Sequence, residues 1–481
     1  MKSYDLIIVG GGVVGCALAW YFSRFDLAVL LLEKESDLCC GVSKANSGVM
    51  HSRSYWTPES LKGAMHLRSL ERLEQAITEC DLMVRRCGAL TVALEKAEVD
   101  YLRLIEERGQ YPDSEILGPQ ETLMIEPNVN PALYAAYLDP HVAVISPFHL
   151  TIGLAETARL NGVDLQFGEQ VEGFENDRSQ IRLKTPNRVY KTSYVVTAGG
   201  FGAPDLIQGT GDSLAPLLPV RGEYYLLDRE CDGFVNRVLY PVPGEKSKGI
   251  LVCPTPEGNV LAGPNFEFLD RETVVTTHRG LREVAAGARR LAPGIPLEQT
   301  IHLFAGVRPT LPDRDFYIFF STQYSRVLHI AGAESPGLTA AFGIAEYVGD
   351  LLQTRGLNQR EKTRFVRRRA FPVFRETDWA TRDRLISQDP DWGKIVCRCE
   401  EVTLAEVKHI LLHSPGCATL DSLKKRIRVT AGRCQGSFCL MNLPRILSEV
   451  RGLKPLELLK SGPDSRFLLL ETKEREKTYA G

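Results

Sequence analysis

The first part of the chain combines short apolar runs with one helical pattern. Tyr4 to Val9 is apolar and rich in β-forming residues, and a second such run from Ala28 to Leu32 ends just before Glu33. Residues 13–25 between them are compatible with a helix. This order predicts a strand, a glycine turn, a helix and a second buried strand, which is typical of the start of a parallel α/β sheet.

Later segments repeat the same kinds of pattern. Apolar residues at helical spacing predict helices over 61–79 and 147–160. We expect two later segments to return to the first sheet. They are a strand that ends at 194–197, and a strand, turn and helix over about 327–352. Short apolar runs separated by Pro and Gly over about 205–325 predict an antiparallel substrate domain.

Composition fits a globular protein and excludes some classes of function. The chain has 481 residues, 44% of them hydrophobic and 25% charged, which predicts two or three domains. Its formal net charge of −2 argues against binding to nucleic acid or to an anionic membrane through bulk charge. No apolar run is long enough to span a bilayer, and the N-terminus does not resemble a signal peptide, so we expect a cytoplasmic protein.

A glycine fingerprint lies between the first strand and the first helix. Gly10 permits a tight turn, Gly12 allows the backbone to approach a pyrophosphate, and Gly15 allows the helix to pack closely on the strand. Glu33 ends the second strand, where it can accept hydrogen bonds from a ribose. The fingerprint predicts a dinucleotide but does not separate FAD from NAD. Without a second fingerprint, binding of both is disfavoured.

The segment from His329 to Ala340 favours FAD. It reads as a strand that runs into a helix with small residues at its start, including Gly337, Leu338 and Thr339. Such a helix start can direct backbone N–H groups at the flavin C2 carbonyl and stabilise negative charge on the reduced ring. An ordinary strand–helix turn is the alternative interpretation.

Three further motifs resemble those of the D-amino-acid-oxidase/glycerol-3-phosphate-dehydrogenase superfamily of FAD-dependent enzymes. They are Asn46–His51, Phe304–Pro309 and Glu334–Thr339. With the glycine fingerprint they occur in the family's order and extend the resemblance over residues 3–365. The resemblance implies FAD, and it implies that the loop from Gly41 to His51, including Ser47, passes beside the isoalloxazine ring.

Two residues are the main candidates for substrate chemistry. His51 can act as the base that takes the substrate hydroxyl proton, because an imidazole titrates near neutral pH. Its alternative role is packing on the flavin. Arg308 offers a planar guanidinium that can hold a carboxylate or phosphate, with a structural ion pair as the alternative. Arg314 and Arg53 are weaker candidates for the anion.

Four of the twelve cysteines form two close pairs near the C-terminus. Cys397 and Cys399 are followed, after 34 residues, by Cys434 and Cys439. Four thiolates suit either a tetrahedral zinc ion or a two-iron cluster. A helix between the pairs is expected to begin near Thr403, which opens a capping-box pattern.

The cysteine unit resembles the bacterioferritin-associated-ferredoxin-like [2Fe-2S] domain. The match covers Ile395 to Val450 and includes the Cys-Arg-Cys-Glu and Cys-Gln-Gly motifs. This domain is also fused to the anaerobic glycerol-3-phosphate dehydrogenase large subunit, which the whole chain resembles. The resemblance implies a [2Fe-2S] cluster in preference to zinc. Arg53 departs from the pattern of many iron–sulfur-fused relatives, and this weakens glycerol 3-phosphate as the substrate.

Together the motifs predict an FAD-dependent dehydrogenase that oxidises a small anionic hydroxy substrate, of the glycerol 3-phosphate or 2-hydroxy-acid type. Electrons are expected to pass from FAD to the cluster and then to a carrier or quinone, because a cluster converts two-electron into one-electron transfer. The electron acceptor is expected to be a protein or a membrane-associated subunit, which can place the chain at the inner face of the membrane. Two alternatives stay open: oxidation of an amino acid, secondary amine or opine, and a non-catalytic redox subunit.

The predicted fold class is α/β, with a Rossmann-like FAD-binding domain, a mixed α+β substrate domain and a small helical iron–sulfur domain. The predicted boundaries are an oxidoreductase over 1–365 (nucleotide-binding parts 1–80, 145–205 and 325–365; substrate domain 81–144 and 206–324), a charged linker over 366–394, a [2Fe-2S] domain over 395–455 and a tail over 456–481.

Overall fold

The computed structural model describes residues 2–177, 180–244 and 249–470. Backbone contacts divide the chain into two compact units. The first comprises Met1–Leu32, Cys39–Asp164 and Val171–Arg368, and the second comprises Glu33–Leu38, Leu165–Gln170 and Arg369–Gly481. Each unit is described by itself.

An eight-stranded sheet carries the N-terminal fingerprint. Its centre is parallel, because β1 (Ser3–Val9) pairs in parallel with both β2 (Val29–Glu33) and β12 (Val189–Thr197), and β12 pairs in parallel with β20 (Val327–Ala331). Four strands extend this centre: β9 (Asp164–Phe167), β10 (Gly173–Asp177), β11 (Gln180–Lys184) and β19 (Tyr317–Phe320). The carboxyl ends of the parallel strands therefore share one edge, where ligands bind in such sheets.

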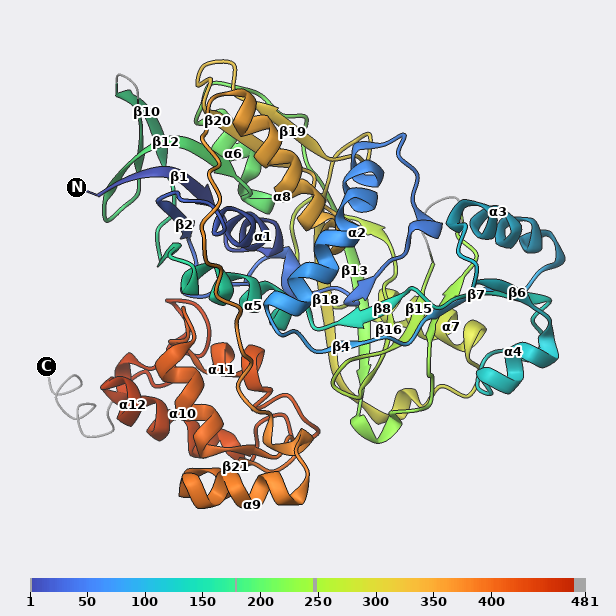
Figure 1. The fold of residues 1–481 in the computed structure, drawn as a ribbon. Helices are drawn as coiled ribbons and strands as arrows, with labels where there is room; N and C mark the ends of the chain where they lie inside the picture. Colours follow the sequence, from blue (N-terminus) through green and yellow to red (C-terminus); the bar gives the residue numbers. More distant parts are fainter. Residues whose placement is uncertain (1, 178–179, 245–248, 471–481) are drawn as a thin grey trace, which may run out of the picture. The chain divides into compact units, whose positions relative to one another are not determined.

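Four helices pack beside this sheet (Figure 1): α1 (Val13–Phe22), α2 (Leu61–Glu79), α5 (Pro147–Leu160) and α8 (Gly337–Thr354). Every residue of α1 is buried, as expected for a helix that is apolar on all sides. Trp20 of α1 packs edge-on against Phe342 of α8, and its indole N–H donates to Glu79 at the end of α2. These contacts hold α1, α2 and α8 together.

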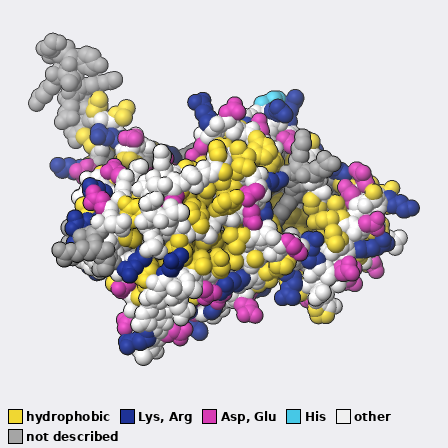
Figure 2. Space-filling view, turned by 90° about the horizontal axis from the view of Figure 1, so that it is seen from above, with side chains coloured by type: hydrophobic (Ala, Val, Ile, Leu, Met, Phe, Trp, Pro, Cys, Tyr) yellow, Lys and Arg dark blue, Asp and Glu magenta, His cyan; other side chains and the backbone are white. Residues whose placement is uncertain are grey.

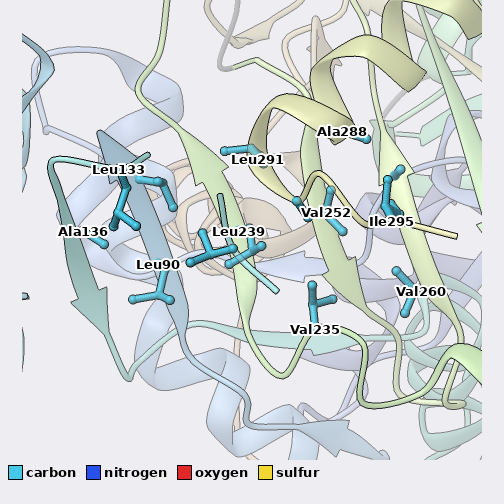
Figure 3. Close-up of a cluster of buried hydrophobic side chains, with 14 of the residues drawn as sticks. Leu90, Leu133, Ala136, Val235, Leu239, Val252, Val260, Ala288, Leu291 and Ile295 are labelled. Atoms are coloured by element: carbon cyan, nitrogen blue, oxygen red, sulfur yellow. The ribbon is translucent and has the colours of Figure 1, made fainter. Parts of the chain in front are cut away.

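A nine-stranded sheet forms the rest of the first unit: β5 (Ala89–Ala93), β6 (Glu115–Leu117), β7 (Ala135–Asp139), β13 (Leu218–Leu227), β14 (Val238–Pro241), β15 (Leu251–Pro254), β16 (Val260–Gly263), β17 (Glu267–Phe268) and β18 (Thr300–Thr310). Helix α7 (His278–Leu291) covers it, and Figure 3 shows Leu239, Val252 and Val260 of the strands with Ala288 and Leu291 of α7 in one buried cluster. Leu227 and Tyr225 of β13 belong to this cluster, which therefore anchors that long strand.

The smaller elements of this unit are three short strands that form one sheet, β3 (Val49–Met50), β4 (Val84–Arg85) and β8 (Ala143–Ile145), and three helices, α3 (Val99–Gly109), α4 (Pro119–Ile125) and α6 (Ala203–Gln208).

The second unit is mainly helical. It contains α9 (Trp379–Gln388), β21 (Ile395–Cys397), β22 (Val402–Thr403), α10 (Leu404–His413), α11 (Leu420–Ile427) and α12 (Leu443–Arg451). Val407, Leu423 and Leu447 of the three C-terminal helices are fully buried in one core. Because a small domain buries little apolar surface, its folded state needs further stabilising interactions. Buried ion pairs between its segments provide such interactions.

Two buried acids, Glu400 and Asp37, form these ion pairs. Glu400 accepts hydrogen bonds from Arg375 and Arg428, and Asp37 accepts a bidentate pair from Arg426 at 2.7 and 2.9 Å. Burial alone would raise the pKa of Asp37, but the hydrogen bond and charge of Arg426 hold this pKa below its usual range.

The predicted fold class is confirmed, and several elements begin and end where the sequence places them. The helices over 61–79 and 147–160 coincide with α2 and α5, and Thr403 caps α10 through a complete capping box with Glu406. The helix predicted over 13–25 ends earlier, at Phe22.

Two segments differ from expectation. The sheet of the substrate domain is not wholly antiparallel, because β14 runs parallel to β5. The segment predicted as a linker contains α9, and its Phe374 and Trp392 are buried against Ala405 of α10. The apolar side chains of this segment are spaced irregularly among many charges, so no helical period marks α9 in the sequence.

The surface carries charges of both signs. Figure 2 shows Lys and Arg side chains interspersed with Asp and Glu over the visible face, in keeping with the small net charge. None of the helices in the described ranges has the length and apolar character that crossing a membrane requires.

A buried histidine links β20 to its neighbours in the first sheet. The Nδ1 atom of His329 lies 2.8 Å from the Thr197 hydroxyl, and its Nε2 atom lies 3.0 Å from the Thr210 hydroxyl. Burial lowers the pKa of His329 to about 4, against a small opposing effect of Asp212. The imidazole is therefore neutral in the folded protein at neutral pH.

This histidine should make the fold sensitive to acid. Its folded pKa of about 4 lies below the unfolded value of 6.5, so its contribution is complete above about pH 6.5 and is lost as the pH falls toward 4. The loss amounts to roughly 3 kcal/mol. We expect His329→Gln to lower the unfolding temperature at pH 7 and to flatten its decline between pH 6.5 and 4.5, measured by calorimetry. His141→Gln, at an exposed position, should leave that decline unchanged; an unchanged decline in His329→Gln would contradict the assignment.

Candidate active site and redox centre

The glycine turn after β1 leaves no space for side chains. Gly10 has φ of +116°, and a Cβ atom there would lie 2.4 Å from the Ala198 carbonyl oxygen at the end of β12. A Cβ atom at Gly15 would lie 1.8 Å from the Gly10 carbonyl oxygen. Both positions therefore require glycine, and the start of α1 lies directly at the carboxyl edge of the parallel strands.

The start of α1 fits a phosphate group. Gly12 precedes the helix and provides no side-chain cap, while the Val13 N–H donates to the Ser43 hydroxyl at 2.9 Å. Glu33, the last residue of β2, is buried, and its carboxylate accepts the Glu35 N–H. A helix N-terminus without a side-chain cap of its own and an acid at the end of the second strand are features of a dinucleotide site.

The start of α8 is joined to the loop that follows His51. Gly337 begins the helix without a side-chain cap, and Thr339 in its first turn contacts Nδ1 of His66 at 3.2 Å. The Nε2 atom of His66 lies 3.1 Å from the Ser52 carbonyl oxygen. His66 is fully buried, so this bridge fixes the helix start relative to the residue next to His51.

His51 lies in an aromatic setting and contacts a tyrosine. Its Nδ1 atom is 3.1 Å from the Tyr240 hydroxyl, and the two rings are stacked. Tyr55, Trp56 and His66 surround it with ring centroids 6.2 to 6.5 Å away. Burial raises the pKa of Tyr240 well above its usual range, so the phenol stays protonated and can share a hydrogen bond with the imidazole.

Arg308 is half-buried on β18, with its guanidinium 5.4 Å from the ring centre of Phe266. No carboxylate within the described ranges forms a salt bridge with it. Burial raises the pKa of the nearby Tyr224 to about 12, while the charge of Arg308 acts in the opposite direction. Arg308, which is predicted to hold the anionic group of the substrate, is thus a half-buried cation without an acidic salt-bridge partner among the described residues.

The His51 loop and Arg308 are brought to the same side of β18. A Cβ atom at Gly306 would lie 2.3 Å from the Ala45 carbonyl oxygen, so this strand touches the loop that leads to His51. Side chains two residues apart on a strand share a face, which places Arg308 on the face of Gly306. Tyr224 and Tyr240 belong to one buried cluster and connect the two candidate residues.

The remaining candidates are not equivalent. Ser47 is half-buried in a loop that Asn46 shapes by bonding the Gly48 N–H and the Ser43 carbonyl. Arg314 stacks on Phe266 at 5.1 Å, next to Arg308, whereas Arg53 is exposed and stacks on Tyr111. The structure therefore brings Arg314, and not Arg53, to the ring that Arg308 contacts.

The four C-terminal cysteines interact as two pairs, each with one member from either motif. Cys397 hydrogen-bonds with Cys439, which lowers the pKa of Cys439 to about 7 and raises that of Cys397. Cys399 hydrogen-bonds with Cys434. Each pair can thus share one proton.

The two thiol pairs together offer four sulfur ligands to a metal centre. Two thiol pairs can supply the four thiolates of a two-iron cluster, whereas a structural zinc site is a closed tetrahedron.

Comparison with known proteins agrees with this geometry. Residues 5–351 match the family model described as FAD dependent oxidoreductase. The chain belongs to this family. Residues 395–449 match the model of the BFD-like [2Fe-2S] binding domain. The predictions of FAD and of a [2Fe-2S] cluster are thereby confirmed, as is the prediction of an FAD-dependent oxidoreductase.

Named relatives extend the comparison. The chain is 33% identical to glycerol 3-phosphate dehydrogenase of Caloramator mitchellensis, over 98% of this chain and 99% of the relative. It is 29% identical to the mitochondrial L-2-hydroxyglutarate dehydrogenase of Nematostella vectensis, over 73% of this chain and 90% of the relative. L-alpha-glycerophosphate oxidase of Mycoplasma pneumoniae, solved with FAD bound, superimposes with a TM-score of 0.70 at 27% identity, over 77% of this chain and 100% of that one.

Three residues at the candidate site were not predicted from the sequence: His66, Tyr224 and Tyr240. Each lies inside an ordinary helix or strand, and each acquires its role through a partner more than ten residues away. For His66, a histidine on the apolar side of a predicted helix was an available signal. The two tyrosines carry no comparable signal, because buried aromatic residues are normal in strands.

The fingerprint can be tested with two matched glycine substitutions. Gly15→Ala places a Cβ atom against the Gly10 carbonyl, so α1 must move and purified protein should contain less than about a tenth of the normal FAD. Gly294→Ala, at an exposed turn after α7, meets no atom within 4 Å and should retain FAD fully. Mass spectrometry of the released nucleotide and flavin absorbance give the measurement. Equal FAD content in both variants would show that the fingerprint does not hold the cofactor.

Proposed function

We propose that this protein is an FAD-dependent dehydrogenase for a small anionic hydroxy substrate, of the glycerol 3-phosphate or 2-hydroxy-acid type. The observation that supports the proposal is that the loop leading to His51 touches β18 at Gly306, on the face of the strand that also carries Arg308. When bound, the flavin of FAD accepts a hydride and the [2Fe-2S] cluster passes single electrons.

His51 takes the proton of the substrate hydroxyl. In the tautomer in which Nδ1–H donates to the Tyr240 oxygen, Nε2 carries the lone pair that accepts this proton. The stacked Tyr240 and the surrounding aromatic rings restrict the orientation of the imidazole. Removal of the hydroxyl proton makes the C–H bond of the same carbon a better hydride donor.

Arg308 holds the anionic group of the substrate. Its guanidinium forms a planar fork that matches a carboxylate or phosphate, and stacking on Phe266 limits its movement. Arg314 on the same ring adds positive charge beside it. Fixing the anion orients the carbon that carries the hydroxyl group.

The choice of a hydroxy substrate is supported by the named relatives. The glycerol 3-phosphate dehydrogenase of Caloramator mitchellensis matches the chain over nearly its whole length, and the L-2-hydroxyglutarate dehydrogenases match its larger part. Both names describe oxidation of an alcohol in an anionic molecule. For the cluster we propose Cys397, Cys399, Cys434 and Cys439 as ligands, and an electron-accepting protein or membrane-associated subunit as the partner.

Substitution of His51 should mainly affect the rate of flavin reduction, whereas substitution of Arg308 should mainly affect substrate binding. His51→Ala removes the base and should slow flavin reduction by roughly 10²- to 10⁴-fold. Arg308→Ala removes a charged hydrogen-bonding group and should weaken substrate binding by roughly tenfold or more. The measurement is anaerobic stopped-flow bleaching of the flavin with a panel of glycerol 3-phosphate, 2-hydroxy acids and amino acids.

Arg53→Ala is the matched control, because this exposed arginine stacks on Tyr111 instead. The substrate affinity of this variant should be closer to that of the parent protein than the affinity of Arg308→Ala. Normal rates and affinities in both His51→Ala and Arg308→Ala would show that the active site lies elsewhere. Bleaching by amino acids alone would favour amine oxidation, and no bleaching by any compound would favour a non-catalytic redox subunit.

The proposed cluster ligands can be tested by removing one of them. Cys434→Ala leaves one of the two irons with a single thiolate, which cannot hold it, so iron, inorganic sulfide and the reduced-cluster signal in electron paramagnetic resonance should all disappear. FAD and flavin bleaching by substrate should largely remain. Cys417→Ala, at a buried cysteine of the same unit outside the proposed set, is the control and should keep the cluster. One zinc and no cluster signal in the parent would contradict the proposal.

A further inference from the structure

A buried carboxylate lies beside the loop that carries His51. Asp139 ends β7, and its side chain is fully buried. One of its oxygens accepts a hydrogen bond from the Ser52 hydroxyl, and the other accepts the backbone N–H of His141 at 3.0 Å. Ser52 directly follows His51 in the chain, so the carboxylate is bonded to the neighbour of the candidate base.

Asp139 is bonded by neutral donors. Within residues 2–177, 180–244 and 249–470, no Lys, Arg or His side chain forms a salt bridge with it, and its hydrogen bonds come from a hydroxyl and a backbone amide. A carboxylate that is buried without a cation costs free energy. Such a cost is typical of a functional site, where a rule of stability is broken for another reason.

Strand pairing places this carboxylate on the face of the sheet that contacts His51. Asp139 of β7 lies opposite Ala89 of β5, and Ala89 lies beside Val238 of β14. Residues in register on neighbouring strands share a face, and so do residues two apart on one strand. Tyr240, two residues after Val238, is therefore on the same face as Asp139. Its hydroxyl lies 3.1 Å from Nδ1 of His51.

The charge of Asp139 reaches the tyrosines that pack against the imidazole. Burial is the main cause that raises the pKa of Tyr55 well above its usual range, and the charge of Asp139 is the next. Burial also dominates the raised pKa of Tyr240, with smaller contributions that include Asp139. The ring centres of these two tyrosines lie 6.2 and 6.1 Å from that of His51. A charge that acts on both rings also acts on the imidazole packed against them.

The other titratable side chains around this pair are neutral, bonded elsewhere or exposed. Burial is the main cause of a raised pKa in a group of phenols and thiols that therefore stay protonated: Tyr55, Tyr111, Tyr137, Tyr224, Tyr240, Cys87 and Cys253. His66 is bonded at both ring nitrogens, and Lys62 lies 3.7 Å from Glu334. Arg53 is exposed, and Arg308 stacks on Phe266.

We propose that Asp139 is a positioning residue whose buried negative charge stabilises the imidazolium formed when His51 takes the substrate hydroxyl proton. The inference rests on the proposed role of His51. The proton moves from the substrate oxygen to Nε2 of His51, and Asp139 exchanges no proton. Because the carboxylate is fully buried and held by Ser52, solvent does not screen its charge and the site needs no reorganisation as the imidazolium forms.

The test is the pH dependence of flavin reduction by substrate in the full-length holoenzyme. His51 accepts a proton only as the neutral imidazole, so the rate should rise with pH. Asp139→Asn keeps the size of the side chain and its hydrogen bonds but removes the charge that favours the imidazolium. The midpoint should therefore move to lower pH by about one unit, and the rate at high pH should fall by about tenfold. A purely structural role would lower the rate without moving the midpoint.

Asp113→Asn is the matched control. The Asp113 side chain is 57% exposed and bonds the ring of His141, the residue whose backbone N–H binds Asp139. Solvent and salt screen this charge, so the midpoint and the rate should stay as in the parent. Asp139→Ser is also neutral and can still bond Ser52, so it repeats the test if Asp139→Asn does not fold. FAD content and unfolding temperature report the folding of each variant.

A second measurement needs no substrate. Nuclear magnetic resonance of the holoenzyme labelled with ¹³C-histidine follows the titration of His51, whose signal is identified by its loss in His51→Ala. The titration midpoint should move to lower pH by about one unit in Asp139→Asn and should not move in Asp113→Asn. The difference should persist between roughly 0.05 and 0.5 M salt, because a buried charge is screened little.

The outcomes separate this inference from the proposed function. An unchanged His51 midpoint in the neutral Asp139 variants, or an equal shift in Asp113→Asn, would overturn the role of Asp139. An equal fall in rate when Asp139→Asn is added to His51→Ala would do the same, because the carboxylate would then act without the imidazole. Flavin reduction at the parent rate in His51→Ala would instead contradict the proposed base, and the resonance titration would still decide whether the charge of Asp139 acts on the imidazole.

Discussion

The close packing of α1 on the end of β1 is the constraint on which the first unit depends. The helix approaches so closely that a single Cβ atom at Gly15 would collide with the Gly10 carbonyl, and one at Gly10 would collide with Ala198. This contact aligns the helix start with the edge at which β1 and β12 end. The same backbone geometry that excludes side chains leaves room for a pyrophosphate, so the cofactor site and the packing of the sheet have one cause.

The substrate side is held to this scaffold by polar bridges between distant segments. His66 joins the first turn of α8 to Ser52, next to the candidate base. Glu334, just before α8, is buried and accepts a hydrogen bond from Thr310 of β18, two residues after Arg308. The strand that carries the arginine and the loop that carries the histidine are therefore both tied to the start of one helix. Buried hydrogen bonds of this kind restrict geometry more than they add stability.

Local patterns made much of the fold predictable from the sequence. The helix over 61–79 and the capping box at Thr403 depend on neighbours three or four residues apart, and both are found as expected. The contact of Tyr240 with His51 spans 189 residues and depends on which strands pair, which no local pattern encodes. The segment over 366–394 is similar: its many charges indicate a linker, whereas Trp392 is buried by Phe374 of the same segment and by Ala405 of α10, and the charge pattern does not encode these contacts.

The second unit solves a different physical problem, which is to hold four thiols in a very small domain. Its core is made by three short helices, and buried ion pairs such as that of Glu400 supplement the limited apolar burial. Pairing Cys397 with Cys439 and Cys399 with Cys434 crosses the two motifs, so the loop before α10 and the loop before α12 depend on each other. Because one pair is buried and the other partly exposed, the unit is asymmetric about the thiols. In the proposed cluster, the ligands Cys399 and Cys434 would therefore lie nearer to solvent than Cys397 and Cys439.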